Sequence, residues 1–198
     1  IPLPMQFRYV HTEEALTAAL KELDAFPKLC LDCETTGLQA TIAKIRLLQL
    51  CNAAPDDENR IIYVLDLFKV KADERLKQLI ESRAMLLAHN MNFDFQFLLS
   101  IGIDFKGKIF DTYVAERVLR SGFKEKRISP QAKKAYFSDV SCSLKAVAER
   151  RLDLDISKEQ QKSDWGAENL ELEQIEYAAA DVDILPQIAA LQLEELKS

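Results

Sequence analysis

Residues 29–38, LCLDCETTGL, decide how this chain folds, because they begin as an apolar run and end in an acidic turn. An apolar run of this length predicts a short buried strand. Residues two apart on a strand share a face, so Asp32 and Glu34 project together from its end. A buried pair of carboxylates repels itself unless it is protonated or bridged by a cation. Taken alone, two acids facing solvent at a polar strand end are the simpler interpretation of this common pattern.

The segments after this strand extend it into a sheet. Two further apolar runs, residues 44–51 and 60–66, predict strands joined by a polar turn, so the first three strands form an antiparallel meander. From Lys71 onward, hydrophobic residues recur at helical spacing and alternate with short apolar runs. We predict helices over 12–26, 72–82, 92–101, 112–119, 143–151 and 170–197, with Pro186 kinking or dividing the last, and short strands over 85–88 and 108–110.

The order of these elements predicts one α/β domain over residues 1–198, with a central mixed five-stranded sheet flanked by helices. Residues 1–6 are expected to be an N-terminal tail or residues added to the native chain. Residues 121–141 are basic and are predicted to be irregular.

The overall charge argues against one class of function. The chain has 198 residues, with 26 Lys and Arg against 32 Asp and Glu, so its net charge is −6. This balance argues against nucleic-acid binding by bulk positive charge. No apolar run approaches the roughly 18 residues of a membrane span, so we expect no membrane partner.

The four cysteines predict a reducing environment rather than a metal or disulfide site. Cys30 and Cys33 have CxxC spacing, but residues three apart on a strand point to opposite faces. Their thiols therefore cannot share a metal ion or form a disulfide. We expect buried free thiols and a cytoplasmic protein.

Two later segments place further acids at element ends or on projecting faces. An apolar strand ends at His89, and Asp94 lies in the first turn of the helix that follows. There an acid also stabilises the positive end of the helix dipole. Tyr177 and Asp181 lie four residues apart and share a helix face, as they would on an ordinary surface helix. Each segment alone favours the structural interpretation.

Together the segments supply four carboxylates: Asp32, Glu34, Asp94 and Asp181. Four converging carboxylates require a divalent cation, and hard oxygen ligands select Mg²⁺ or Mn²⁺. No Cys and His set has zinc spacing, and the chain has only 2 His. The sequence also lacks a P-loop, a G-x-G-x-x-G and a G-x-S-x-G motif.

Three motifs in order resemble those of the DEDD superfamily of 3′–5′ exonucleases: Asp32-x-Glu34-Thr-Thr-Gly-Leu, His89-Asn90-x-x-Phe93-Asp94 and Tyr177-x-x-x-Asp181. The tyrosine marks a resemblance to the DEDDy branch, closest to the proofreading exonuclease domain of bacterial DNA polymerase I and related to ribonuclease D. Residues 158–165, KEQQKSDW, resemble a further segment of both relatives, in which we expect Trp165 to pack in the core. The resemblance implies a ribonuclease H-like (DnaQ-like) fold.

The resemblance also implies two divalent cations, Mg²⁺ or Mn²⁺, that support phosphodiester hydrolysis. In this pattern Asp32 bridges both cations, and Asp94 supports the one on the leaving-group side. Glu34 and Asp181 complete the position that binds the attacking water. Tyr177, with a pKa of about 10 in water, is a poor base at neutral pH and orients that water instead.

The implied substrate is the 3′ end of single-stranded DNA, released as nucleoside 5′-monophosphates by a monomeric enzyme of the bacterial cytosol or nucleoid. Leu38 would wedge against the terminal bases, and Thr35 and Asn90 would contact the terminal nucleotide. Two alternatives stay open: an enzyme that trims RNA 3′ ends, like ribonuclease D, and a catalytically inactive nucleic-acid-binding module. The parent chain is either a free-standing exonuclease or one that continues into a polymerase domain.

Positive charge is concentrated in one stretch, from Arg117 to Lys134. It holds seven basic residues (Arg117, Arg120, Lys124, Lys126, Arg127, Lys133 and Lys134) and one acidic residue, Glu125. A solvated loop is the default interpretation, and a patch that contacts phosphates near the active site is the alternative. The net acidity therefore argues only against tight, non-specific duplex binding.

Overall fold

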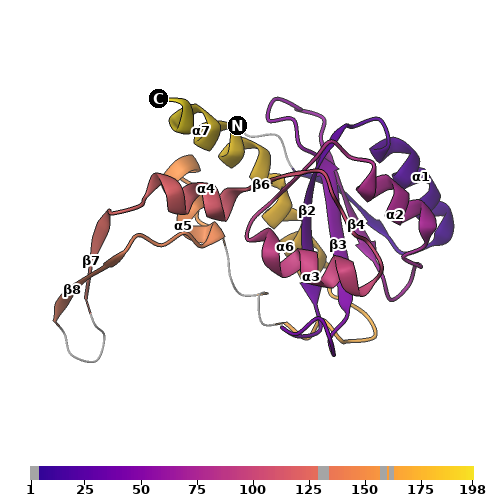
Figure 1. The fold of residues 1–198 in the computed structure, drawn as a ribbon. Helices are drawn as coiled ribbons and strands as arrows, with labels where there is room; N and C mark the ends of the chain where they lie inside the picture. Colours follow the sequence, from indigo (N-terminus) through magenta and orange to yellow (C-terminus); the bar gives the residue numbers. More distant parts are fainter. Residues whose placement is uncertain (1–4, 129–133, 157–159, 161–162) are drawn as a thin grey trace.

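A mixed β-sheet forms the centre of the molecule in the computed structural model, which describes residues 5–128, 134–156, 160 and 163–198 (Figure 1). Within these residues the main sheet has six strands, in the order β1-β4-β3-β2-β5-β6. Their bounds are β1 (Gln6–Val10), β2 (Lys28–Thr35), β3 (Ile45–Asn52), β4 (Ile61–Asp66), β5 (Met85–Ala88) and β6 (Lys108–Asp111). The predicted antiparallel meander is confirmed as β2, β3 and β4, while β1, β5 and β6 pair in parallel with β4, β2 and β5.

The prediction of a five-stranded sheet was wrong, because β1 is an additional edge strand. Its residues alternate between exposed and partly buried positions, and only Val10 is fully buried. The strand pairs with β4 along its whole length, from Gln6 opposite Ile61 to Val10 opposite Leu65. A half-buried edge strand depends on its neighbour more than on its own hydrophobic pattern. Residues 1–4 of the predicted tail lie outside the described residues.

Helices cover both faces of the sheet, so the body has three layers (Figure 1). One face packs against α1 (Glu13–Leu23), α2 (Glu74–Glu81) and α3 (Met91–Ser100), and the other against α6 (Leu172–Asp183) and α7 (Leu185–Lys197). Alternate residues of β2 divide between these cores, so that Cys33 faces α3 and Cys30 faces α6. The opposite orientation of the two thiols is confirmed, and all four cysteines are free, although Cys142 is only half-buried. By the same alternation, Asp32 and Glu34 project on the α6 side.

The C-terminal helical segment is divided, as Pro186 predicts. α6 ends at Asp183 and α7 begins at Leu185, with Pro186 in its first turn, where the missing N–H has no helical partner to lose. Ala178 and Ala179 of α6 are completely buried against the sheet. These small side chains let α6 approach β2 closely. None of the described helices, these two included, is long and apolar enough to cross a membrane.

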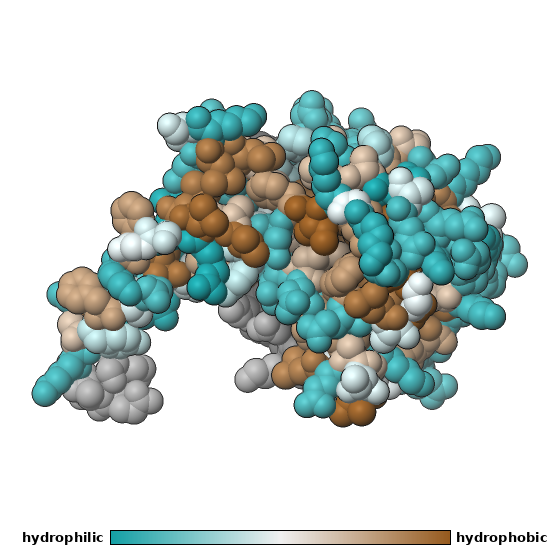
Figure 2. All heavy atoms as spheres, in the orientation of Figure 1, coloured by the Kyte–Doolittle hydropathy of each residue, from teal (hydrophilic) through white to brown (hydrophobic). Residues whose placement is uncertain are grey.

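An antiparallel hairpin connects α4 (Thr112–Leu119) to α5 (Leu144–Leu152), which corrects the prediction that residues 121–141 are irregular. Its strands are β7 (Lys124–Ile128) and β8 (Ala135–Asp139). Most of their side chains are exposed, so no alternation of apolar and polar residues marks them in the sequence. The hairpin projects away from the layered body (Figure 1), and Figure 2 shows hydrophobic side chains along it among hydrophilic ones.

Candidate active site

A cavity of about 570 Å³, which we call the acidic cavity, opens beside the end of β2. Its walls come from the turn after β2, from the starts of α3, α4 and α5, and from α6. Seven of the residues predicted for the site line it: Asp32, Glu34, Thr35, Leu38, Asn90, Tyr177 and Asp181. The remaining one, Asp94 of α3, lies behind this lining, buried beside Cys33.

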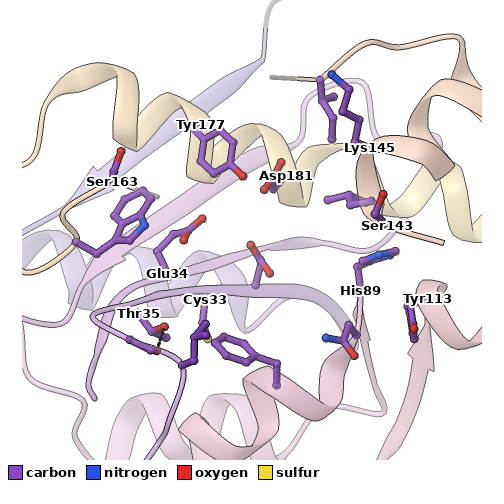
Figure 3. Close-up of a pocket in the computed structure, with 18 of the residues that line it drawn as sticks. Cys33, Glu34, Thr35, His89, Tyr113, Ser143, Lys145, Ser163, Tyr177 and Asp181 are labelled. Carbon is purple, nitrogen blue, oxygen red and sulfur yellow. Dashed lines mark hydrogen bonds between the residues drawn. The ribbon is translucent and has the colours of Figure 1, made fainter. Parts of the chain in front are cut away.

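Three carboxylates meet in the acidic cavity. Asp32, Glu34 and Asp181 each offer one oxygen, and these oxygens all lie within 4.8 Å of one another. Figure 3 shows Glu34 extending from β2 toward the face of α6 that carries Tyr177 and Asp181. Strand alternation places the first two acids together, and the four-residue spacing on α6 places the tyrosine beside the third. Carboxylate oxygens at this separation suit a divalent cation.

Asp94 adds a fourth carboxylate in a buried position. Its side chain is almost fully enclosed, with 2% of the residue's surface exposed. Its Oδ1 atom has no hydrogen-bond partner among the described residues. A buried acceptor without a partner lowers the stability of the protein. A cation on the oxygen-only donor set of Asp32 and Asp94 would satisfy this atom, so the residues present fit a metal ion.

Burial and mutual repulsion favour protonated carboxyl groups in the cation-free cluster. Burial, followed by the charges of Asp94, Glu34 and Asp181, raises the pKa of Asp32 well above its usual range. Burial and the charges of Asp181 and Asp94 raise the pKa of Glu34 to about 9. Burial raises the pKa of Asp94 to about 7. Positive charge in the cavity would reverse these shifts, because it stabilises the ionised carboxylates.

Tyr177 and His89 face the acidic cavity as neutral groups. Burial, followed by the negative charge of Asp181, raises the pKa of the Tyr177 phenol far above its usual value, so it remains a hydrogen-bond donor at neutral pH. Burial lowers the pKa of His89 to about 4. The His89 Nδ1 atom lies 2.8 Å from the Thr112 Oγ1 atom, and its ring packs edge-on against Tyr113. Neither ring adds positive charge to the cluster.

The residues predicted to contact substrate lie at the rim of the acidic cavity. Leu38 is 86% exposed at the edge of the cavity, a position that suits an apolar contact with a base. The Thr35 hydroxyl donates to the Gly37 carbonyl oxygen at 2.7 Å. Its proton is committed to the turn after β2, so a nucleotide contact would have to use the Thr35 oxygen as an acceptor.

Asp111 fixes the backbone of Asn90. Asn90 precedes α3 in a left-handed conformation with φ of 63°, and its own side chain makes no capping bond. The Asn90 and Met91 N–H groups donate to the two Asp111 carboxylate oxygens at 2.9 and 3.0 Å. The Tyr113 N–H donates to the same carboxylate at 2.9 Å, so Asp111 also caps α4. This arrangement leaves the Asn90 amide at the cavity wall.

Sequence reasoning missed other residues of the cavity wall. Ser143 and Lys145 lie at the start of α5, and Figure 3 shows them across the cavity from Ser163. No spacing rule links these positions to β2, because only the packing of α5 brings them there. Trp165 also lines the cavity, and its burial, with 5% exposed, confirms the predicted core position. Residues 158, 159, 161 and 162 of the same predicted segment lie outside the described residues.

Solved structures with a similar fold include a described exoribonuclease. Escherichia coli RNase D, an exoribonuclease involved in structured RNA processing, superposes with a TM-score of 0.74 at 22% identity over 98% of this chain and 46% of its own. Brucella melitensis NrnC superposes with a TM-score of 0.71 at 25% identity over 98% of this chain and 82% of its own. These superpositions confirm the ribonuclease H-like fold expected from the sequence, and the acidic cavity is the candidate active site within it.

The sequence comparisons then give the family. A family model described as 3′-5′ exonuclease matches residues 7–196, and this chain belongs to that family. DNA polymerase I of Aquifex aeolicus is 36% identical over 184 residues, which are 93% of this chain and 27% of that protein. The exosome complex component 10 homolog of Drosophila melanogaster is 24% identical over 181 residues, 89% of this chain and 17% of that protein. The chain thus spans less than a third of the curated relatives it matches.

Proposed function

We propose that this 3′–5′ exonuclease is of the proofreading type and hydrolyses the 3′ ends of single-stranded DNA to nucleoside 5′-monophosphates. One observation carries the proposal: the oxygens of Asp32, Glu34 and Asp181 lie within 4.8 Å of one another in a cavity that Tyr177 also lines. The 36% identity to a DNA polymerase I supports DNA as the substrate. The same match supports a polymerase domain as the partner of this domain in the parent protein.

The acidic residues are proposed to hold two divalent cations, Mg²⁺ or Mn²⁺. Asp32, Glu34 and Asp181 would hold one of them. Asp32 and Asp94 would hold the other, which would use the unpartnered Asp94 Oδ1 atom. When bound, such cations lower the pKa of coordinated water and neutralise the charge that develops at phosphorus.

The chain's own groups would position water and substrate. Tyr177 stays protonated at neutral pH and would donate a hydrogen bond to the attacking water, while the Glu34 carboxylate accepts one from it. The exposed Leu38 side chain would pack against the terminal base, and the Asn90 amide would contact the terminal nucleotide. Apolar and stacking contacts of this kind accept any base, as a 3′-end nuclease requires.

The competing function is the trimming of RNA 3′ ends. One assay distinguishes the two functions: kcat/KM is measured in Mg²⁺ for 5′-labelled single-stranded DNA and for RNA of the same sequence and length. We expect a higher kcat/KM for DNA. A higher kcat/KM for RNA would overturn the choice of substrate and leave the exonuclease assignment intact. No hydrolysis of either strand, with Mg²⁺ or with Mn²⁺, would instead indicate an inactive binding module.

A further inference from the structure

The β7–β8 hairpin exposes aromatic and basic side chains on both of its faces. Directly paired residues of antiparallel strands point to the same face, so Arg127 and Tyr136 share one face and Lys126 and Phe137 the other. Tyr136 is 47% exposed and Phe137 is 72% exposed. Aromatic side chains this exposed, on an arm that projects from the body (Figure 2), are accessible to a partner molecule.

The hairpin and its base are positively charged, although the whole chain is acidic. Residues 117–139 include seven basic and two acidic side chains. The two acids are paired within the hairpin, Glu125 with Arg127 and Asp139 with Lys124. On the face that carries Arg127 and Tyr136, the arginine is shared with Glu125, whereas Arg117 at the base of the hairpin forms no ion pair with the residues that the structure describes. The partner that this charge favours is therefore an anion with apolar faces.

One face of the hairpin adjoins the acidic cavity. Ser143 and Lys145 of α5 line the acidic cavity and also a neighbouring hollow. The other wall of that hollow includes Arg127 of β7. Because Tyr136 pairs with Arg127 across the hairpin and shares its face, a nucleic-acid strand that leaves the acidic cavity past Lys145 comes next to both side chains.

The base of the hairpin joins the acidic cavity by a second route. Tyr113 of α4 lines the acidic cavity and also two hollows that contain Arg117. The Arg117 guanidinium lies 5.8 Å from the centre of the Tyr113 ring. Arg120 lines one of these hollows as well. Arginines thus line hollows between the cavity wall and the hairpin, together with Glu125, Glu149 and Asp139.

We propose that the Arg127–Tyr136 face of the hairpin binds the part of a nucleic-acid single strand that lies on the 5′ side of the bond to be cut. A base stacks on Tyr136, and the Arg127 guanidinium contacts a phosphate. The inference rests on the proposed function, because it takes the strand's 3′ end to occupy the acidic cavity. The combination of an aromatic platform and basic groups suits single strands and is tolerant of sequence.

Kinetics on substrates of two lengths test the proposal. A dinucleotide fills only the acidic cavity, whereas a long single-stranded oligonucleotide also reaches the hairpin. We expect Tyr136→Ala to raise KM for the long strand at least about fivefold, with KM for the dinucleotide and both kcat values unchanged. Arg127→Gln should also reduce the slope of log KM against log salt concentration for the long strand by about 0.7, the value for one phosphate contact with a single strand. Phe137→Ala, which removes an aromatic ring from the opposite face, is the matched control and should change neither KM.

Several results would overturn the proposal. They are an unchanged KM for the long strand in Tyr136→Ala, an equal rise for both substrates, and an effect of Phe137→Ala as large as that of Tyr136→Ala. A change of oligomeric state in Tyr136→Ala, measured by analytical ultracentrifugation, with unchanged strand binding would show that the hairpin contacts a second copy instead. If the unmodified protein cuts neither substrate, the proposed function fails. Binding of the labelled long strand in EDTA, measured by fluorescence anisotropy, then still tests the hairpin. We expect Tyr136→Ala and Arg127→Gln to weaken binding and Phe137→Ala to leave it unchanged.

Discussion

At the scale of single residues, two spacing rules place the side chains of the site, and burial of its carboxylates determines their protonation. Strand alternation brings Asp32 and Glu34 to one face, and helical spacing brings Tyr177 beside Asp181. Burial of this cluster then favours the protonated carboxyls and raises their pKa values. The protein thus holds, without a cation, a group of acids that destabilises it when ionised.

The pH dependence of stability tests this state of the cluster. Glu34 has a pKa of about 9 in the folded protein and about 4.3 in an unfolded chain. Between these values the unfolded chain binds fewer protons than the folded one, so the free energy of unfolding falls as pH rises. The contribution of Glu34 to the free energy of unfolding is complete below the pKa of the unfolded chain, and it is lost as pH rises through about 9.

We therefore expect the free energy of unfolding of the cation-free protein to fall by more than about 1.4 kcal/mol between about pH 5 and pH 9. This is the free energy that corresponds to a shift of one pKa unit. Urea unfolding in EDTA measures this loss. Glu34→Gln should reduce it, and added Mg²⁺ should restore stability at the higher pH, because a cation binds the ionised acids. Asp56→Asn, at an exposed position outside the cavity, is the control. A stability that rises with pH in EDTA would contradict the protonated cluster.

Tyr177 gives a second prediction at this scale. If its phenol orients the attacking water, Tyr177→Phe should lower kcat on the order of 100-fold. KM for single-stranded DNA should stay nearly constant, because the ring and its packing remain. Steady-state kinetics in Mg²⁺ measure both constants. Equal changes in kcat and in strand affinity would show that Tyr177 binds substrate or supports the fold instead.

The sequence predicts some of these residues and not others for a physical reason. Asp32, Glu34 and Asp181 are predictable because each is placed by the period of its own element. Lys145 and Ser143 reach the cavity only through the packing of α5, which no local pattern encodes. The role of Asp111 also depends on packing, because its one carboxylate caps α4 and holds the backbone of Asn90, which lies on another element.

At the scale of elements, the central strands and the edge strand β6 were predictable, whereas the edge strand β1 and the β7–β8 hairpin were not. β2, β3 and β4 are buried on both faces and read as apolar runs. β1 and the β7–β8 hairpin consist largely of exposed residues, and their pairing depends on a neighbouring strand. These strands form only because another strand pairs with them, and a local hydrophobic pattern does not predict that pairing.

A buried ion pair ties the sheet to the segment that carries Trp165. Arg46 of β3 and Asp66 of β4 have fully buried side chains, and the Arg46 Nε atom donates to the Asp66 Oδ1 atom at 2.9 Å. Arg46 also donates to the Trp165 carbonyl oxygen at 3.4 Å and to the Ala167 carbonyl oxygen. The Tyr9 hydroxyl donates to the Asp66 Oδ2 atom at 2.5 Å. One arginine thus connects the meander to the wall of the acidic cavity.

Removing this arginine should have a large effect on folding. Arg46→Ala leaves Asp66 buried without its counter-charge, so we expect a loss of about 3–5 kcal/mol in the free energy of unfolding. Chemical denaturation measures it. The matched control is Arg75→Ala, which breaks ion pairs to Glu13 and Asp73 in which the arginine side chain is 46% exposed, and it should cost much less. Equal losses in the two variants would contradict a structural role for the buried pair.

At the scale of the whole molecule, the distribution of charge matters more than the net value of −6. Acids gather in the cavity, where bound cations would neutralise them, and basic groups gather on the hairpin. A strand that runs from the hairpin to the cavity therefore meets positive charge first. This arrangement reconciles an acidic protein with a polyanionic substrate.

The central claim is that the carboxylate cluster removes nucleotides from a DNA 3′ end, and one digest tests it most directly. A 5′-labelled single-stranded DNA is incubated in Mg²⁺ with the unmodified protein, with Asp181→Asn and with the exposed control Asp56→Asn, after equal folding of the three has been verified by circular dichroism. We expect a ladder of products shortened from the 3′ end for the unmodified protein and for Asp56→Asn, and intact DNA for Asp181→Asn. A folded Asp181→Asn protein that produces the same ladder at a similar rate would contradict the account.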